Sequence, residues 1–258
     1  MAKIKALVLR AAGINCDLET EHALQLAGSE TQRLHINRII ENPACLDEFQ
    51  ILVFPGGFSY GDDVAAGRIL ANQIVHHLAK SLEKFVDDGK LILGICNGFQ
   101  VLVKAGLLPG KGFKKGSVTI TYNDSGKFED RWVYLQPATE KCVFLNNERI
   151  HLPIAHGEGK VVTTDKETLD KLESEGNVAF RYVDAEGNQG GFPVNPNGSM
   201  NSIAGLTDST GRIFGLMPHP ERFVRPVQHP NWSRFKEKPA ADGMTIFNNA
   251  VKFVKENL

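Results

Sequence analysis

Residues 91–100 read LILGICNGFQ. The three apolar residues at the start predict a short strand covered on both faces, which is typical of a parallel sheet. Glycines stand two residues before and two residues after Cys96, and the segment that follows has the character of a helix. A Gly-x-Cys-x-Gly sequence between a buried strand and a helix has the form of a nucleophile elbow, a tight turn that lifts one side chain above the sheet. The stretch therefore predicts an α/β fold with Cys96 at the carboxyl edge of the sheet.

The chain before this stretch alternates between strand and helix patterns. Apolar runs bounded by glycine or proline predict strands, and the segments between them carry apolar residues at helical spacing. The expected strands are 3–9, 32–36 and 51–54, and the expected helical segments are 17–28, with Asp17 as its cap, 43–49 and 69–89. Strands and helices in this order form a mostly parallel central sheet with right-handed crossovers and helices on both faces.

The pattern changes at about residue 117 to shorter strands of alternating polarity. These segments predict an additional, smaller antiparallel sheet. The expected strands are 118–122, 131–135, 149–154 and 178–183, followed by a hairpin formed by 203–206 and 213–217. Helices are expected at 165–175 and 244–254. With no internal repeat and no clear linker, the sequence predicts one domain over 1–258, and the polar, aperiodic stretch 224–243 is expected to be a surface excursion.

Composition excludes several classes of protein. The 29 basic and 30 acidic side chains leave a formal net charge of -1, and no basic run suggests a nucleic-acid partner. No apolar stretch approaches the length needed to span a bilayer, and no secretory signal pattern is evident. The four cysteines are widely scattered, which is unlike a disulfide scaffold or a zinc site. A cytoplasmic protein with free thiols and no bound metal is the expectation.

Cys96 has the chemistry of a nucleophile in this setting. The start of the following helix supplies backbone N–H groups and a positive dipole end, which favour a thiolate and can stabilise an oxyanion. A base and a group to orient it are also required. His219 and Glu221 supply them in a proline-stiffened Met-Pro-His-Pro-Glu segment that follows an expected strand. We therefore predict Cys96, His219 and Glu221 as the catalytic residues.

A second oxyanion donor is expected in the loop after strand 51–54, which reads Pro-Gly-Gly and faces the same sheet edge. The backbone amides of Gly57 and Asn97 together are predicted to hold the tetrahedral oxygen. The glycine-rich segments lack both the phosphate-binding Gly-x-x-x-x-Gly-Lys pattern and the dinucleotide fingerprint, so nucleotide binding by this chain is not predicted. The alternatives are a buried structural cysteine at 96, a surface turn at His219 and a plain glycine turn at Gly57.

The elbow and the late His-Pro-Glu resemble class I, or triad, glutamine amidotransferases, which have a flavodoxin-like α/β fold and an elbow that reads Gly-x-Cys-x-Gly-x-Gln. Four further stretches narrow the resemblance to the glutaminase subunits of phosphoribosylformylglycinamidine synthase. They are PGGFSYGD at 55–62, IAHGEG at 154–159, NPNGS at 195–199 and MPHPER at 217–222. In order, these motifs cover nearly the whole chain up to residue 222.

The resemblance implies a glutaminase that forms a γ-glutamyl thioester on Cys96 and passes ammonia to a separate synthetase subunit. That subunit would use ATP and Mg²⁺ to convert formylglycinamide ribonucleotide to formylglycinamidine ribonucleotide in de novo purine synthesis, with a small third subunit in the complex. This chain itself would carry no cofactor. The resemblance also implies that Gln100, His156 and Glu158 help to hold glutamine. Without it, Gln100 would be a packing residue on a helix face, and His156 and Glu158 would belong to a solvated turn.

The sequence departs from the pattern of this family at two places. Ala11-Ala12 replaces a bulkier residue and a proline before the first Gly-x-Asn-Cys-Asp stretch, and 224–243 is longer than the family leads one to expect. Two other functions remain open at this point. One is another enzyme, either a glutaminase of another pathway, such as vitamin B6 synthesis, or a cysteine hydrolase of the related elbow-bearing superfamily. The other is a catalytically silent subunit that keeps the fold for binding alone.

Overall fold

The computed structural model describes residues 3–62, 65–234 and 240–258. The strands are β1 (Lys5–Arg10), β2 (Glu30–His35), β3 (Ile51–Phe54), β4 (Leu91–Ile95), β5 (Val118–Thr121), β6 (Glu129–Pro137), β7 (Ile150–His156), β8 (Lys160–Thr163), β9 (Val178–Val183), β10 (Ile203–Thr207) and β11 (Ile213–Leu216). The helices are α1 (Asp17–Leu26), α2 (Ile36–Glu41), α3 (Arg68–His77), α4 (Ala79–Asp87), α5 (Asn97–Ala105), α6 (Lys166–Ser174) and α7 (Gly243–Asn257).

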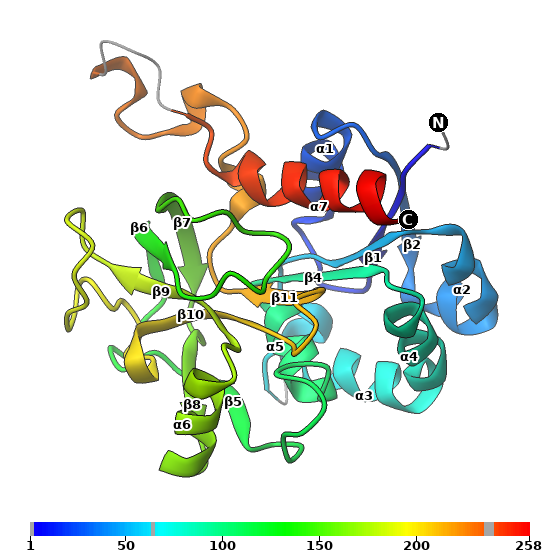
Figure 1. Cartoon of the computed structure of the whole chain (residues 1–258), viewed down its shortest axis with the longest axis horizontal. Helices are drawn as coiled ribbons and strands as arrows, with labels where there is room; N and C mark the ends of the chain where they lie inside the picture. The colour runs from blue at the N-terminus through cyan, green and yellow to red at the C-terminus, as the bar shows by residue number, and fades with distance from the viewer. Residues whose placement is uncertain (1–2, 63–64, 235–239) are drawn as a thin grey trace.

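A nine-stranded sheet runs through the molecule in the order β2-β1-β3-β4-β11-β10-β9-β6-β7. The strands from β2 to β11 are parallel, and those from β11 to β7 are antiparallel. Figure 1 shows α1 and α7 on one face of the parallel half and α3, α4 and α5 on the other. The expected α/β fold with helices on both faces is confirmed. Its parallel half has the doubly wound order in which ligands bind at the carboxyl ends of the strands.

The loops after β1 and β3 meet at this carboxyl edge, because the chain leaves β1 toward one side of the sheet and β3 toward the other. The Phe58 backbone N–H donates to the Gly13 carbonyl at 2.9 Å, and the Tyr60 N–H donates to the Ala12 carbonyl at 2.7 Å. A Cβ on Gly13 would lie 1.9 Å from the Phe58 oxygen, so the two loops approach too closely for a side chain. The loops after β1 and β3 therefore form one packed unit.

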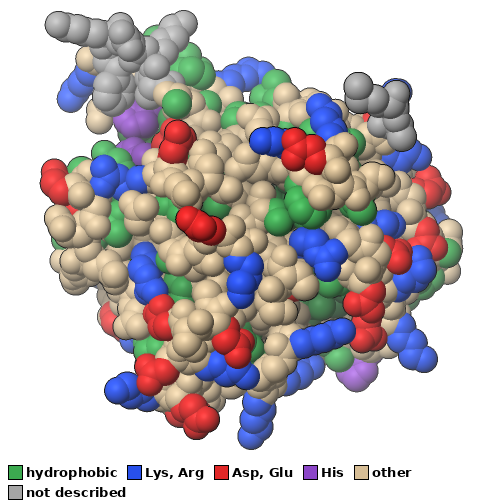
Figure 2. Space-filling model, in the orientation of Figure 1, with side chains coloured by type: hydrophobic (Ala, Val, Ile, Leu, Met, Phe, Trp, Pro, Cys, Tyr) green, Lys and Arg blue, Asp and Glu red, His purple; other side chains and the backbone are tan. Residues whose placement is uncertain are grey.

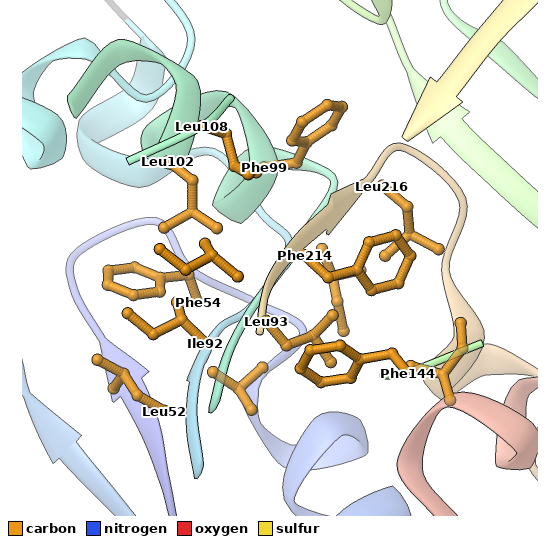
Figure 3. Close-up of a cluster of buried hydrophobic side chains, with 14 of the residues drawn as sticks. Leu52, Phe54, Ile92, Leu93, Phe99, Leu102, Leu108, Phe144, Phe214 and Leu216 are labelled. Atoms are coloured by element: carbon orange, nitrogen blue, oxygen red, sulfur yellow. The ribbon is translucent and has the colours of Figure 1, made fainter. Parts of the chain in front are cut away.

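The core lies between the parallel strands and α5. Figure 3 shows Phe99 and Leu102 of α5 above the sheet, near Phe54 of β3. All three are buried, as are Ile92 and Leu93 of β4. Burial of each such side chain contributes about 1.5 to 3 kcal/mol to folding. This packing fixes α5, and with it the turn that holds Cys96.

Several elements differ from those predicted. The single helix expected at 69–89 is two helices, because the chain bends at Leu78 (φ −121°) so that α3 packs on α5 and α4 packs on β4. Leu78 is itself buried, which is why the apolar periodicity runs through the bend. Most of the predicted antiparallel strands extend the main sheet, and the separate small antiparallel sheet consists of β5 and the unpredicted β8. Asp17 does not cap α1; its carboxylate lies 2.9 Å from both Arg10 and Arg33.

The stretch 224–243 begins on the body of the molecule. His229 packs against Trp132 of β6, with ring centroids 5.0 Å apart, and its Nε2 lies 3.3 Å from Nδ1 of His151 on β7. Two short 3₁₀ turns, Pro226–Gln228 and Trp232–Arg234, flank this contact. Residues 235–239 lie outside the described part of the chain. The surface excursion predicted for 224–243 therefore stays a prediction.

The molecular surface mixes charges of both signs. Figure 2 shows Lys and Arg side chains interspersed with Asp and Glu on the face in view, as the near-zero net charge leads one to expect. Among the described residues, no helix has the length and apolar character that a bilayer crossing requires.

Candidate active site

Cys96 lies at the turn between β4 and α5 with φ 51° and ψ −106°. A positive φ is uncommon for a residue with a side chain and persists only where the surroundings impose it. A Cβ on Gly98 would lie 1.9 Å from the Phe54 carbonyl oxygen, and a Cβ on Gly94 would lie 2.9 Å from the Gly98 carbonyl. Both glycines are thus required by close backbone contacts, and they hold Cys96 at the edge of the sheet.

His219 and Glu221 follow β11, which is the parallel neighbour of β4. The Nδ1–H of His219 donates to Oε1 of Glu221 at 2.6 Å, and the His219 backbone N–H donates to the Pro153 carbonyl at 2.8 Å. His219 is 2% exposed and Glu221 1% exposed. Because both side chains are desolvated, the pair is rigid and the charge of Glu221 acts on the ring with little screening.

The second ring nitrogen of His219 is the one available for proton transfer. Its Nε2 is buried and has no hydrogen-bond partner by distance and angle among the described residues. Burial alone would lower the pKa of His219, but the Glu221 carboxylate and the nearby Cys96 and Cys16 sulfurs raise it well above its usual value. Cys96 and His219 therefore have the arrangement of a thiol next to its base, oriented by a carboxylate.

The predicted oxyanion residues follow two neighbouring strands, Gly57 after β3 and Asn97 after β4. Gly57 follows β3 with φ 141°, and a Cβ there would lie 2.7 Å from the Asn15 nitrogen. Asn97 begins α5 directly after Cys96. Its side-chain oxygen accepts a hydrogen bond from the Ser59 backbone N–H at 3.2 Å, which ties the Gly57 loop to the helix. Gly57 and Cys96 line one cavity, and Asn97 is the residue after Cys96; that their amides hold an oxyanion stays a prediction.

A cavity of about 210 Å³ opens beside Cys96, and Gly57, Gln100, His156 and Glu158 line it. The Gln100 side chain has both polar atoms engaged: Nε2 donates to the Glu158 carbonyl at 2.6 Å, and Oε1 accepts from Asn97 Nδ2 at 2.9 Å. Gln100 therefore braces the cavity wall. The contact of Glu158 with Gln100 is made by its main chain, and its half-buried carboxylate belongs to the wall.

His156 offers an unused acceptor. The Asn123 side-chain NH₂ donates to the carbonyls of Lys127 and His156, and its oxygen accepts from the Gly159 N–H at 3.0 Å. That oxygen lies 3.1 Å from His156 Nδ1, so Nδ1 must carry the proton and Nε2 a lone pair. Burial, with the charge of His219, lowers the pKa of His156 to about 3, which keeps the ring neutral. Nε2 is buried without a partner among the described residues.

Three residues of the site were not predicted from the sequence. The Cys16 sulfur lies close to the His219 ring and accepts a hydrogen bond from Arg222 Nη2 at 3.2 Å. The position of Cys16 just after β1, at the same sheet edge as Cys96, could have indicated that it belongs to the site. Asn123 orients His156 but lies in an Asn-Asp-Ser-Gly stretch that reads as an ordinary turn.

Cys16, His219 and Glu221 also bring three potential metal ligand atoms within 4.8 Å of one another, the one such group among the residues that the structure describes. The guanidinium of Arg222 contacts the Cys16 sulfur and lies 3.9 Å from Glu221 Oε1. A fixed positive charge at this distance disfavours a bound cation. That this chain binds no metal stays a prediction.

Comparison with known proteins agrees with this geometry. The CobB/CobQ-like glutamine amidotransferase domain family matches residues 3–254. The chain is 49% identical to phosphoribosylformylglycinamidine synthase subunit PurQ of Dehalococcoides mccartyi, over 99% of this chain and 100% of that protein. It is 42% identical to PurQ of Methanococcus maripaludis strain S2, over 96% and 97%.

A solved structure gives the same result. A chain in the structure of PurLQS from Thermotoga maritima is 34% identical, with 98% of this chain and 100% of that chain covered and a TM-score of 0.75. The family match over residues 3–254 includes the segments that carry Cys96, His219 and Glu221. The chain therefore belongs to the CobB/CobQ-like glutamine amidotransferase family and, within it, to the PurQ subunits of phosphoribosylformylglycinamidine synthase.

Proposed function

We propose that this chain is a glutaminase subunit that hydrolyses glutamine to glutamate and ammonia at Cys96. It supplies the ammonia to a synthetase subunit that converts formylglycinamide ribonucleotide to formylglycinamidine ribonucleotide in purine synthesis. The observation that carries this proposal is the arrangement around His219. Glu221 binds its Nδ1 at 2.6 Å, and its Nε2 remains free for the proton of the Cys96 thiol.

The first half-reaction forms a thioester. The proton of the Cys96 thiol passes to His219 Nε2, which the raised pKa of the ring favours, and the thiolate attacks the side-chain carbonyl carbon of glutamine. The backbone amides of Gly57 and Asn97 hold the oxyanion, and each such donor is worth about 3 kcal/mol in related acyl transfer. The imidazolium then returns the proton to the leaving nitrogen, the C–N bond breaks, and ammonia departs.

The second half-reaction consumes water. His219 takes a proton from a water molecule, which attacks the thioester carbonyl. The C–S bond breaks, the Cys96 sulfur regains the proton, and glutamate leaves. Glutamine and water thus give glutamate and ammonia, and Glu221 stabilises the imidazolium in both halves.

The cavity walls support an amide-bearing substrate. The lone pair on His156 Nε2 can accept a hydrogen bond from a substrate N–H group, and the neutral ring does not repel the ammonium group of an amino acid. Gln100 and Glu158 hold the wall in place through their mutual bond. We assign these three residues to glutamine binding, His156 by direct contact and the other two through the shape of the cavity.

The rim of the cavity fits a partner subunit. Phe58, Tyr122 and Phe128 line it and are 46%, 70% and 54% exposed. A synthetase seated over these aromatic side chains would remove apolar surface from water and keep ammonia from escaping into solvent. ATP and Mg²⁺ belong on that subunit in this proposal, with a small third subunit in the complex. We place the reaction in the cytoplasm, where the four free cysteines of this chain would remain reduced.

The decisive experiment compares Cys96→Ala with the unmodified chain, each assembled with its synthetase subunit. Glutamine-dependent formation of the amidine should disappear in the variant, and ammonia-dependent formation should persist. Cys142→Ala, which removes a buried thiol beside Thr207 and Gly211, serves as the control. Retention of glutamine-dependent activity by Cys96→Ala would contradict the proposal.

A glutamine-mimicking electrophile separates this proposal from the silent-subunit alternative. It should label Cys96, and excess glutamine should protect the thiol. If Cys96 reacted with a general thiol reagent but gave no glutamine-protected adduct, the chain would be a binding subunit. If the adduct formed but only a synthetase of a different pathway co-purified, the glutaminase chemistry would stand and the acceptor would change.

A further inference from the structure

A second thiol, that of Cys16, is buried next to His219 and Glu221. It ends the loop after β1, is 1% exposed, and its backbone N–H donates to the Gly56 carbonyl at 3.3 Å. It lies near both the imidazole of His219 and the carboxylate of Glu221, since one ligand atom each of Cys16, His219 and Glu221 lie within 4.8 Å of one another. The reaction proposed above makes no use of this thiol.

The hydrogen bonds of Cys16 fix the direction of its lone pairs. Its thiol hydrogen points to Asn15 Oδ1, 3.2 Å from the sulfur, and the sulfur accepts from Arg222 Nη2 at 3.2 Å. Arg222 is held in turn by Glu19 of α1, with Nε 3.1 Å from Oε1. The sulfur is therefore clamped between the first loop and Arg222, and its remaining electron density faces the His219 ring.

The ring itself is confined by the same contacts. A Cβ on Gly56 would lie 2.8 Å from His219 Cε1 and 3.1 Å from the Cys16 sulfur. The backbone of Gly56 and the sulfur of Cys16 thus pack near the Cε1 edge of the ring. Glu221 restrains only Nδ1, so without the sulfur the ring would gain room to tilt, and Nε2 would move relative to the thiol of Cys96.

We infer that Cys16 is a positioning residue for His219, held in place by Arg222, in the glutaminase reaction proposed above. It acts as a neutral thiol: burial raises its pKa, with the carboxylate of Glu221 acting in the same direction. A neutral, polarisable sulfur can accept from the imidazolium edge without a competing charge. Cys16 is therefore distinct from Cys96 in role, although both thiols contact the same histidine.

The test uses Cys16→Ala and Cys16→Ser in the chain assembled with its synthetase. In Cys16→Ala we expect kcat for glutamine to fall about tenfold and KM to change less than about twofold, because the base moves and the glutamine cavity does not. The alkaline limb of the pH profile of kcat/KM should shift to lower pH, since the imidazolium loses an acceptor. Cys16→Ser should recover most of kcat, because a hydroxyl can also donate to Asn15 and accept from Arg222.

Two further variants make the outcome decisive. Cys142→Ala also empties a buried thiol site and should leave kcat and the pH profile unchanged. If Cys16→Ala does not fold, Arg222→Lys keeps the charge but cannot bind Glu19 and Cys16 together, and it should lower kcat in the same way. A folded Cys16→Ala or Arg222→Lys chain with unaltered kcat and pH profile would overturn the inference. The proposed function would survive that result, because it depends on the separate loss of activity in Cys96→Ala.

Discussion

Nδ1 of His219 lies 2.6 Å from Oε1 of Glu221, and both side chains are buried. This short bond assigns the ring tautomer, because a carboxylate can only accept. It also sets the direction of proton transfer, since it leaves Nε2 as the basic atom. The hydrogen bond therefore determines which ring nitrogen can exchange a proton with Cys96.

Glu221→Gln should lower kcat for glutamine by about 10²- to 10⁴-fold, as loss of the orienting carboxylate does in related triads. The amide NH₂ can donate to Nδ1, which would place the ring proton on Nε2 and block its use as a base. The measurement is steady-state glutamine hydrolysis in the assembled complex. Glu148→Gln, at an exposed position, is the matched control. An active Glu221→Gln chain would remove Glu221 from the mechanism.

Gly98→Ala should destabilise the fold by about 1 to 3 kcal/mol, the usual cost of forcing an extra methyl group into a packed interior. Its Cβ would lie 1.9 Å from the Phe54 carbonyl oxygen, so α5 would have to move away from β3. Denaturant unfolding measures the difference. Gly191→Ala, at an exposed position with no atom within 4 Å of the added carbon, should be nearly neutral. Equal effects of the two substitutions would contradict the packing argument.

Gly159→Ala should raise KM for glutamine, by about tenfold if the bond from His156 Nε2 to substrate is lost. The added Cβ would lie 2.2 Å from His156 Cε1, so the ring must turn. Its hydrogen bond to Asn123 would break at the same time. Initial rates over a range of glutamine concentrations test this, again with Gly191→Ala as control. An unchanged KM would mean that His156 does not touch the substrate.

The stability of the chain should fall as the pH drops from about 6.5 to about 5. Burial lowers the pKa of His156 to about 3, whereas an unfolded histidine titrates near 6.5, so the unfolded chain binds the extra proton in this window. The loss from His156 is on the order of 2 kcal/mol over this range. His219 does not contribute to it, because the raised pKa of that ring gives a contribution that is constant below about pH 6.5.

Denaturant unfolding at both pH values measures this slope. His156→Gln, which cannot be protonated, should flatten it, and His76→Gln, at an exposed position, should not. An unaltered slope in His156→Gln would show that the ring is not buried in its neutral form.

Much of the fold was predictable because it depends on local pattern. The bounds of β3 and β9 agree with those expected at 51–54 and 178–183, since each is an apolar run bounded by turn residues. The break at Leu78 was not predictable, because a buried leucine satisfies the helical period on both sides of the bend. Strand β8 was missed because its four residues are paired only through β5, a partner that local pattern does not specify.

The site divides in the same way. The sequence by itself determined the chemistry. The glycines around Cys96 specify a tight turn, and a spacing of two residues keeps His219 close to the Glu221 carboxylate. Only the tertiary structure decided which groups surround His219 and His156. Cys16 lies more than 200 residues from Arg222 in the chain, and Asn123 lies 33 residues from His156. These contacts form because the carboxyl ends of parallel strands lie at one edge of the sheet. The spacing of residues in the sequence does not indicate which of them come together there.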